Sequence, residues 1–250
     1  MNHLETSDWL VLNNLIYKIY STNDLSEMRK TLLEQLKMVI DFDSADFFLG
    51  KKNGTKGLEG LVSYNCDTDT SAQYDELDYS RGIMYTGKSM VYRESDIISE
   101  DKRKQTEYYQ KVYRPNNWHY SLQMVIAKEK KFLGVITFYR TIGKDDFNYD
   151  DIFLLDMLKD HIALRLYQTT INEAFEADKL TVHQTVEKHQ LTKREETIIR
   201  LLINGLDNDV ICEELSISPN TLKKHILNIY RKLGINNRIQ MFKMIKEKEK

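Results

Sequence analysis

The spacing of apolar residues predicts a helical start, a strand-rich middle and a helical second half for this chain. Near the start, apolar residues recur at intervals of three or four, which places them on one face of a helix. They are Leu25, Met28, Leu32, Leu36 and Val39. Asp24 has the residue type of an N-cap and Glu27 follows three positions later, as at many helix starts. We therefore expect a helix over residues 24–40, preceded by another helix.

Four strand-like runs in the middle predict β-strands, at residues 45–49, 61–64, 122–127 and 132–139. The last two runs flank a polar tetrapeptide, which is typical of a β-hairpin. The final run is apolar without interruption, so we expect it to be a central strand. Gly134 within this run indicates a close approach of backbone or of a ligand.

From residue 150 the pattern is helical again, with apolar side chains on two sides of the helix. One stripe is Ile152, Leu155, Leu158, Ile162 and Leu166, and the other is Phe153, Met157 and Leu164. One side can cover the sheet while the other meets a partner helix, for example from a second copy of the chain. Residues 168–190 are polar and lack Pro and Gly, so we expect them to extend this helix as a stiff linker.

Helices that bracket an antiparallel sheet predict an α+β fold for the first part of the chain. Residues 132–139, the acidic-Phe segment 145–147 and the helix over 150–167 resemble the end of a GAF domain. The likeness spans about residues 20–168 and implies a GAF/PAS-like sensory domain, an antiparallel sheet flanked by helices. PAS domains and the ligand-binding domains of acyl-homoserine-lactone receptors share this architecture and remain alternatives.

The last sixty residues predict short helices with defined ends. Thr192 and Glu195 form a capping box, and Gly205 provides a left-handed stop. Ser218 followed by Pro219 begins a third helix, as an N-cap and a proline in the first helical position. The helix starts and stops thus divide this part into three short helices, followed by a last one that carries Ile239, Phe242 and Ile245.

The third of these helices has one apolar side and one basic side. The apolar side is formed by Leu222, Ile226, Ile229 and Leu233. The opposite side carries Asn220, Lys224, Leu227 and Arg231, flanked by Lys223 and Asn228. A tight turn before a helix with such an outer face predicts a helix-turn-helix, and the alternative is an ordinary amphipathic helix with a solvated basic face.

Residues 191–195, 201–206, 217–225 and 232–238 resemble the LuxR-type helix-turn-helix. The resemblance implies an all-α domain of four helices, in which the third enters the major groove of double-stranded DNA and the fourth supports dimerisation. The DNA-binding residues that it implies are Asn208, Ser218, Asn220, Thr221, Lys223, Lys224, Leu227, Asn228 and Arg231. The chain departs from the family at Asp209, where an acidic side chain should weaken phosphate contacts of the second helix.

Tyrosines are concentrated in the middle of the chain. They are Tyr74, Tyr79, Tyr85, Tyr92, Tyr108, Tyr109, Tyr113 and Tyr120, joined by Trp118. Tyr and Trp combine an apolar body with a hydrogen-bonding tip, which suits a small-molecule pocket. We expect such a pocket to be lined by Tyr85, Tyr109, Tyr113, Trp118 and Phe138. The alternative is that these aromatic side chains fill the core.

Charge is distributed unevenly along the 250 residues, whose net charge is −2. Residues 190–250 hold 12 Lys and Arg against 8 Asp and Glu, a charge of +4. The preceding 189 residues hold 24 against 30, a charge of −6. A small basic module on an acidic body is expected if the C-terminal part meets a polyanion.

Several other classes are disfavoured. The mean hydropathy of −0.53 and the lack of an apolar run of about 20 residues argue against a membrane protein. The start of the chain has no export signal, and Cys66 and Cys212 stand alone, which fits a cytoplasmic location without disulfides. Neither metal nor cofactor is expected, because the six histidines lack ligand spacing. Catalytic motifs are missing, so an enzyme with Cys66 as a reactive thiol is a minor alternative.

Together these patterns predict a cytoplasmic, dimeric transcription regulator. We expect a GAF-like sensory and dimerisation domain over residues 1–168, a helical linker over 169–189 and a LuxR-type DNA-binding domain over 190–250. The expected partners are double-stranded DNA, a second copy of the chain, a small-molecule effector and RNA polymerase. Two alternatives stay open: an acyl-homoserine-lactone-type autoinducer receptor, and a regulator whose N-terminal domain only dimerises or recruits another protein.

Overall fold

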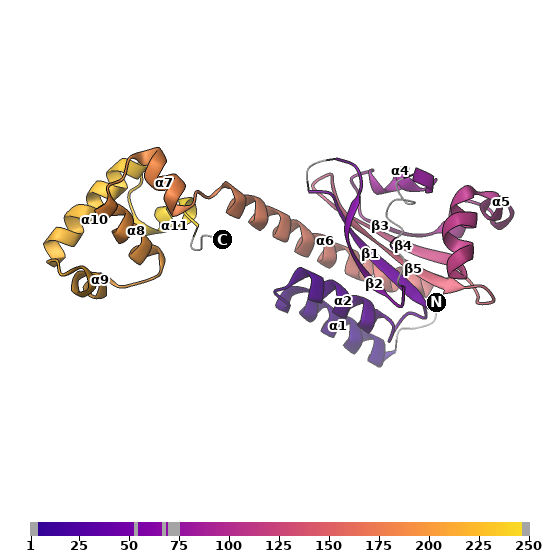
Figure 1. The fold of residues 1–250 in the computed structure, drawn as a ribbon. Coiled ribbons are helices and arrows are strands. Elements are labelled where there is room, and N and C mark those ends of the chain that lie inside the picture. Colours follow the sequence, from indigo (N-terminus) through magenta and orange to yellow (C-terminus); the bar gives the residue numbers. More distant parts are fainter. Residues whose placement is uncertain (1–4, 53–54, 67–68, 70–75, 247–250) are drawn as a thin grey trace. The chain divides into compact units, whose positions relative to one another are not determined.

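The computed structural model describes residues 5–52, 55–66, 69 and 76–246. The chain divides into two compact units, Met1–Gln168 and Thr169–Lys250. The first unit contains a sheet covered by helices on both faces, and the second is built from short helices (Figure 1). Over the described ranges, no helix combines the length and the apolar character that crossing a membrane would require.

An antiparallel sheet of five strands in the order β2-β1-β5-β4-β3 organises the described part of the first unit. The strands are β1 (Ser44–Gly50), β2 (Leu58–Tyr64), β3 (Met90–Arg93), β4 (Trp118–Lys128) and β5 (Lys131–Thr141). The predicted hairpin is confirmed as β4 and β5, and β5 is the central strand. A Cβ added at Gly134 would lie 2.5 Å from the backbone oxygen of Phe48, so the close backbone approach expected there is confirmed.

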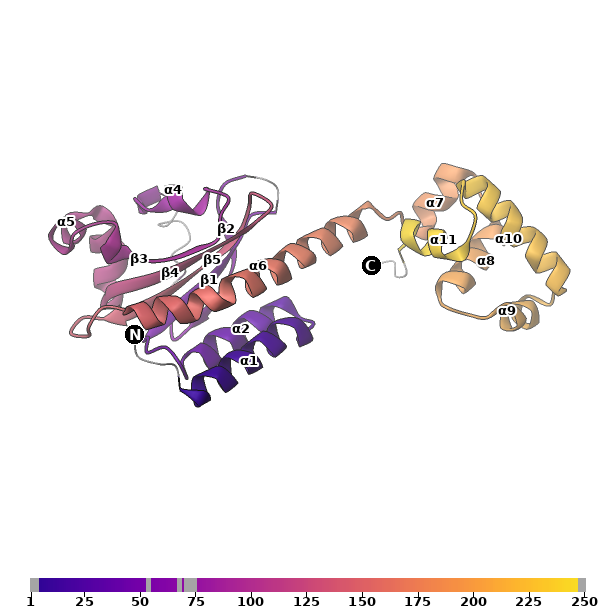
Figure 2. The ribbon, with the colours of Figure 1, turned by 180° about the vertical axis from the view of Figure 1, so that it is seen from behind.

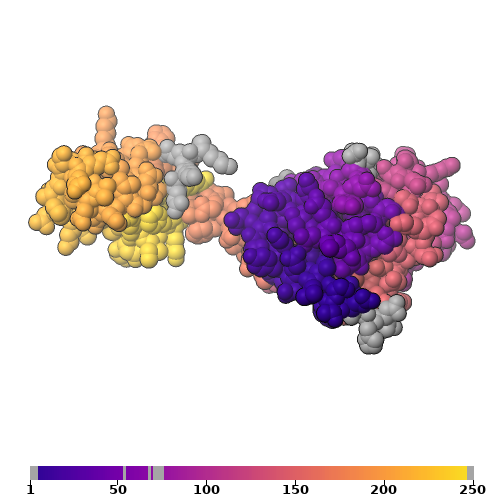
Figure 3. All heavy atoms as spheres, turned by 90° about the horizontal axis from the view of Figure 1, so that it is seen from below, coloured from indigo at the N-terminus to yellow at the C-terminus, as the bar shows by residue number. Residues whose placement is uncertain are grey.

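One face of the sheet is covered by α1 (Thr6–Ser21), α2 (Leu25–Leu36) and α6 (Tyr149–Asp178) (Figure 2). In Figure 3, α1 and α2 form the indigo surface on this side of the first unit. Arg165 of α6 donates hydrogen bonds of 3.0–3.1 Å to the carbonyls of Ile19, Thr22 and Asn23 at the end of α1. A cation at the carboxyl end of a helix is favourable, so this contact helps to hold α6 against α1.

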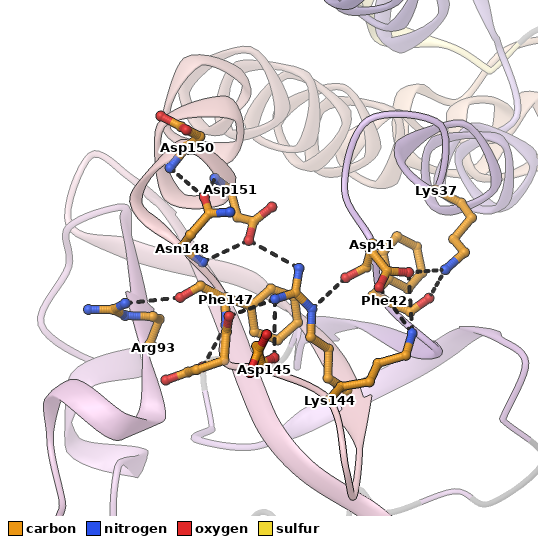
Figure 4. Close-up of polar contacts among 12 residues, drawn as sticks. Lys37, Asp41, Phe42, Arg93, Lys144, Asp145, Phe147, Asn148, Asp150 and Asp151 are labelled. Atoms are coloured by element: carbon orange, nitrogen blue, oxygen red, sulfur yellow. Dashed lines mark hydrogen bonds and ion pairs between the residues drawn. The ribbon is translucent and has the colours of Figure 1, made fainter. Parts of the chain in front are cut away.

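The start of α6 is fixed by Arg140, which lies near the end of β5 and is 8% exposed. Its Nη2 lies 3.1 Å from Asp151 Oδ2, and its Nε donates to the carbonyl of Asp41 at 2.7 Å. The guanidinium carbon lies 4.1 Å from the centroid of the Phe147 ring. Figure 4 labels three of these contact residues, Asp41 before β1, Phe147 before α6 and Asp151 in the first turn of α6. Arg140 therefore joins the sheet to the first turn of α6.

Two helical turns cover the opposite face of the sheet as α4 (Arg81–Met84) and α5 (Glu100–Gln105) (Figure 1). They are supplemented by irregular helical turns over Glu94–Asp96, Tyr109–Tyr113 and Arg114–Asn116. The sheet thus has two cores, one on each face. The core under α1, α2 and α6 is almost wholly apolar, whereas the core under α4 and α5 is rich in aromatic and polar side chains.

Two elements of the first unit differ from the sequence prediction. α2 begins as expected, with the Asp24 side chain accepting from the Glu27 N–H at 2.7 Å, but it ends at Leu36 rather than near residue 40. Beyond that end, Lys37 donates to Asp41 at 2.9 Å and turns the chain toward β1. β3 was not predicted. It is only four residues long, it has a single buried side chain, Tyr92, and its apolar and polar residues do not alternate.

The second unit contains α7 (Val182–His189), α8 (Lys193–Ile203), α9 (Asn208–Leu215), α10 (Pro219–Leu233) and α11 (Arg238–Met244). The predicted continuous helix over residues 168–190 is wrong, since α6 ends at Asp178 and α7 is separate. Thr181 caps α7 by accepting from the Gln184 N–H at 3.1 Å. Val182 is buried in the core of the second unit, so α7 is part of this folded unit.

Candidate nucleic-acid interface

The ends of the C-terminal helices are set by local hydrogen bonds, as predicted. Thr192 accepts from the Glu195 N–H at 3.3 Å, and Glu195 accepts from the Thr192 N–H at 2.8 Å, which confirms the capping box. Gly205 and Gly234 adopt φ angles of +85° and +70°, a left-handed conformation that glycine enters without steric cost. Ser218 caps α10 by accepting from the Thr221 N–H at 3.2 Å.

A tight turn joins α9 to α10. α9 ends where Ser216 takes a left-handed conformation with a φ of +51°, and the Ile217 N–H donates to the Cys212 carbonyl at 3.0 Å. The next residue, Ser218, already caps α10. So short a connection leaves the two helices little freedom, and the turn therefore fixes the direction in which α10 leaves α9.

The apolar side of α10 is packed into the core of the second unit. Leu222, Ile229 and Leu233 are buried there, and Ile226 is half-buried. Lys232 strengthens the attachment, because its Nζ lies 2.7 Å from Oε2 of Glu195 on α8. Burial would raise the pKa of Glu195, but hydrogen bonds from Lys232 and Thr192 outweigh it and lower that pKa below its usual value. α10 is thus held with one side inward.

The other side of α10 is open to solvent. Most of the DNA-binding residues implied by the resemblance are exposed: Asn208, Ser218, Asn220, Thr221, Lys223, Lys224, Leu227 and Arg231. Asn228 is half-buried beside them. Ion pairs engage neither Lys223, Lys224 nor Arg231 among the residues that the structure describes. We call the outward side of α10, with Lys223, Lys224, Leu227 and Arg231, the basic face.

Two arginines of the second unit have structural contacts that the sequence pattern did not reveal. Arg238 donates to the carbonyl of Leu206 at 3.1 Å, and its guanidinium carbon lies 5.5 Å from the ring centroid of Phe242. Arg194 donates to the carbonyl of Leu215, the last residue of α9, at 2.9 Å. Both therefore stabilise loops around the helix-turn-helix. The sequence alone does not show whether an arginine donates to a backbone carbonyl of the protein or to a phosphate of DNA.

Two residues of this unit qualify the sequence prediction. Ile239, expected on the apolar side of the last helix, is 67% exposed, and Met241 is buried in its place. Since α11 starts at Arg238, the residue at 241 rather than that at 239 faces the core. Asp209 lies exposed in the first turn of α9, and its expected effect on phosphate contacts stays a prediction.

A buried side, a tight turn and an outward basic helix are the features of a helix-turn-helix module. Residues 189–245 match the family described as "Bacterial regulatory proteins, luxR family". The "HTH-type transcriptional regulator MalT" of Yersinia pestis (strain Pestoides F) is 38% identical over 65 residues, which are 24% of this chain and 7% of that protein. The C-terminal domain belongs to the LuxR family, and the chain spans only a small part of these curated relatives.

The first unit has the fold of a GAF domain. The phycocyanobilin-bound GAF domain from a cyanobacterial phytochrome aligns with a TM-score of 0.51 over 68% of this chain and 98% of its own, at 10% identity. A phycoerythrobilin-bound GAF domain from a cyanobacterial phytochrome aligns with a TM-score of 0.50 over the same shares, also at 10% identity. At this identity the likeness concerns the fold, and the predicted α+β class with a GAF-like first domain is confirmed.

Three of the five aromatic residues expected at a small-molecule site lie together on the face of the sheet under α4 and α5. Tyr109, Tyr113 and Trp118 are buried there, and Trp118 stacks on Tyr139 with ring centroids 3.7 Å apart. Tyr85 lies at the edge of this cluster, 5.3 Å from the ring of Phe132. These rings contact one another, as expected for a packed aromatic core. Tyr74 lies outside the described residues.

Phe138, the fifth of these residues, lies on the other face of the sheet. Its ring packs on Phe42 at a centroid distance of 5.0 Å, within the core under α1, α2 and α6. Successive side chains of a strand point to opposite faces, so Tyr139 faces the aromatic cluster and Phe138 cannot. The sequence prediction for Phe138 is therefore wrong.

A buried ion pair within the aromatic cluster was not predicted. Arg103 is 1% exposed, and its Nη1 lies 3.0 Å from Oε2 of Glu94, which is 2% exposed. The Arg103 guanidinium carbon also lies 5.2 Å from the ring centroid of Tyr109. Arg103 belongs to the charged run of α5, where nothing in the sequence distinguishes a buried arginine from exposed lysines. No group of three His, Cys, Asp or Glu side chains suited to a metal ion occurs over the described ranges.

Proposed function

We propose that this chain is a transcription regulator that binds double-stranded DNA through the basic face of α10. The observation that carries the proposal is the set of cations on this face that form no ion pair with any described residue and are directed away from a core that fixes the helix. In this proposal Lys223, Lys224 and Leu227 face base edges or phosphates in the major groove. Asn208, Ser218, Asn220, Thr221, Asn228 and Arg231 complete the contact surface, mainly to the backbone.

The modest charge of the domain favours binding as a dimer. Residues 190–250 carry a charge of +4, and a protomer that neutralises about three phosphates would bind weakly by itself. Two protomers would read half-sites about 34 Å apart, one turn of the duplex. The logarithm of affinity should then fall with the logarithm of salt concentration at a slope of about −5. The second copy of the chain and RNA polymerase are the protein partners of this proposal.

The first unit is proposed to carry the regulatory signal. Its GAF-like fold supports a sensory and dimerisation role for residues 1–168, with residues 190–250 as the DNA-binding domain. α6 begins in the first unit and ends in the second, so it is the covalent connection through which a signal would pass. An effector can change DNA affinity only if it binds two states of the protein unequally.

Replacing Lys224 with alanine is expected to weaken specific DNA binding by about 1–3 kcal/mol, the range for a side chain that reads a base. The duplex would be obtained by repeated selection from random-sequence DNA with the full chain. Affinity would be measured by fluorescence anisotropy. Lys188→Ala is the matched control, because Lys188 is an exposed lysine on α7, off the basic face.

Both substitutions remove one positive charge. A difference between their DNA affinities therefore reports the position of the lysine and not the net charge of the protein. Equal losses of affinity for K224A and K188A would show that α10 does not read the duplex. An unchanged circular dichroism spectrum for both variants excludes unfolding as the cause of a loss.

A further inference from the structure

A row of four polar side chains crosses the buried face of the sheet under α4 and α5. Asp46 on β1 pairs with Thr137 on β5, Thr137 pairs with Gln123 on β4, and Gln123 pairs with Tyr92 on β3. Their exposures are 0%, 0%, 1% and 7%, in that order. We call these four residues the polar row. Four consecutive polar side chains in register are unusual on a buried sheet face, where apolar side chains ordinarily pack.

Half of the polar row is satisfied within the protein. The Tyr92 hydroxyl donates to Gln123 Oε1 at 2.7 Å and lies 3.3 Å from Ser80 Oγ. Burial raises the pKa of Tyr92 above its usual value, so this hydroxyl stays protonated and keeps donating. The β3–β4 end of the row is therefore closed by its own hydrogen bonds.

The other half of the row, Asp46 and Thr137, has side-chain oxygens without hydrogen-bond partners among the described residues. Asp46 Oδ1 and Thr137 Oγ1 are buried and form no hydrogen bond in the described part of the chain. The other oxygen of Asp46, Oδ2, accepts a long hydrogen bond of 3.5 Å from the Tyr139 hydroxyl. Ser44 Oγ, two residues before Asp46 on β1, is also buried without a partner. Each such buried group costs about 1–3 kcal/mol, so their clustering indicates a role outside folding.

The Asp46 carboxyl has no counter-ion among the side chains that the structure describes. No Lys, Arg or His among the described residues forms an ion pair with it, and the buried Arg103 is engaged by Glu94. The charged group that affects Asp46 is Asp69, which is itself acidic. Burial, assisted by Asp69, raises the pKa of Asp46 to about 7. A buried carboxyl in these surroundings must keep a proton or meet a cation that the described residues do not supply.

Aromatic rings lie beside the end of the row that Asp46 and Thr137 form. Tyr139, whose hydroxyl touches Asp46, is stacked on Trp118 and packs edge-on against Tyr113 at a centroid distance of 5.9 Å. Aromatic faces attract organic cations and pack against flat apolar groups. An acidic side chain next to aromatic rings is the combination that recognises a protonated amine on an apolar body.

We propose that the end of the polar row formed by Asp46 and Thr137 binds a small organic amine, with its ammonium group on these two side chains and its apolar body against the rings beside Tyr139. The inference rests on the proposal that the first unit takes a small molecule, and it names the class of that molecule. Asp46 supplies charge, and the Thr137 hydroxyl accepts one ammonium hydrogen. The Ser44 hydroxyl offers a further acceptor.

The chemical class of the ligand can be tested with three compounds that share the same aromatic body and differ in charge. They are tyramine, 4-ethylphenol and 3-(4-hydroxyphenyl)propionate. With the full chain at pH about 7.5, tyramine is expected to bind with a Kd below about 1 mM in calorimetric titrations. The neutral and anionic compounds should bind at least about tenfold more weakly, because they offer Asp46 no cation. Failure of tyramine to bind, or equal binding of the propionate, would overturn the inference.

Two near-isosteric variants test whether Asp46 and Thr137 contact the amine. Asp46→Asn removes the charge and is expected to weaken tyramine binding at least about tenfold, while Thr137→Val removes an acceptor and should weaken it about threefold. Asp160→Asn, on the exposed surface of α6, is the control and should leave binding unchanged. Wild-type affinity in both Asp46→Asn and Thr137→Val would place the amine elsewhere and contradict the inference.

The DNA affinity of the same preparations separates this inference from the proposed function. Tyramine binding without any change in DNA affinity would support the amine site and contradict its coupling to DNA. DNA binding by a chain that ignores tyramine, or prefers the propionate, would contradict the amine site and leave the DNA proposal standing.

Discussion

Replacing Asp46 with asparagine is expected to raise the free energy of unfolding by on the order of 4 kcal/mol at pH about 9, and to change it little at pH about 4. The pKa of Asp46 is raised to about 7 in the folded protein by burial, whereas its ordinary value is 3.8. The folded state therefore binds this proton more tightly than the unfolded state. Stability conferred by the proton is present at low pH and is lost as pH rises toward 7.

Asparagine keeps the shape of the side chain but cannot ionise, so it avoids the loss above pH about 7. Urea denaturation of wild type and D46N, at intervals from pH about 4 to 9, measures the difference directly. Asp160→Asn, which changes an exposed carboxylate, should show no such pH dependence. A difference between D46N and wild type that stays constant over this range would contradict the account of Asp46 as a buried carboxyl without a counter-ion.

The gain in stability is expected to be accompanied by a loss of binding. Residues kept at functional sites commonly cost stability, and their replacement then stabilises the fold. Asp46 is fully buried and forms no ion pair with a described residue, so its carboxyl is expected to cost folding stability. A stabilised D46N that no longer binds tyramine would show both effects in one variant.

Replacing Arg140 with methionine is expected to lower the free energy of unfolding by about 3–5 kcal/mol. The substitution keeps an apolar stem but leaves the buried carboxyl of Asp151 without its ion pair. It also removes the donors to the carbonyls of Asp41 and Asp146, at 2.7 Å each. Burial already raises the pKa of Asp151 despite Arg140, so the unpaired carboxyl is expected to be still harder to ionise.

Removal of both members of the pair provides the control. Arg140→Met combined with Asp151→Asn leaves no buried unpaired charge at this site, so it should recover part of the lost stability. Thermal and urea unfolding of the single and double variants give the comparison. A loss below about 1 kcal/mol for R140M, in the range of surface ion pairs, would contradict the role of Arg140 in fixing the start of α6.

The C-terminal domain could be predicted closely from the sequence because its signals are local. A capping box, a left-handed glycine or a serine before a proline depends on residues within one helical turn. The β4–β5 hairpin was predictable for the same reason. α7 was not, because its few apolar residues lie in a polar stretch and its burial depends on the rest of the second unit.

The candidate small-molecule site could be predicted only in part. Phe138 and Tyr139 lie in a run that is apolar apart from Thr137, where no regular alternation shows which side chain faces which side of the sheet. The polar row combines residues from four strands, and Asp46 is 91 positions from its pairing partner Thr137. Such neighbours are set by strand order and register, which a single sequence does not contain.

The measurement that tests the central claim most directly is the salt dependence of DNA affinity, for the wild-type chain and for a variant with Lys223, Lys224 and Arg231 all replaced by alanine. Between about 50 and 200 mM salt, the wild type should show a slope of about −5 in the double-logarithmic plot. The triple variant should bind weakly, with a slope much closer to zero, because each lost phosphate contact removes about 0.9 from it. Wild-type affinity and slope in the triple variant would show that α10 does not meet the DNA.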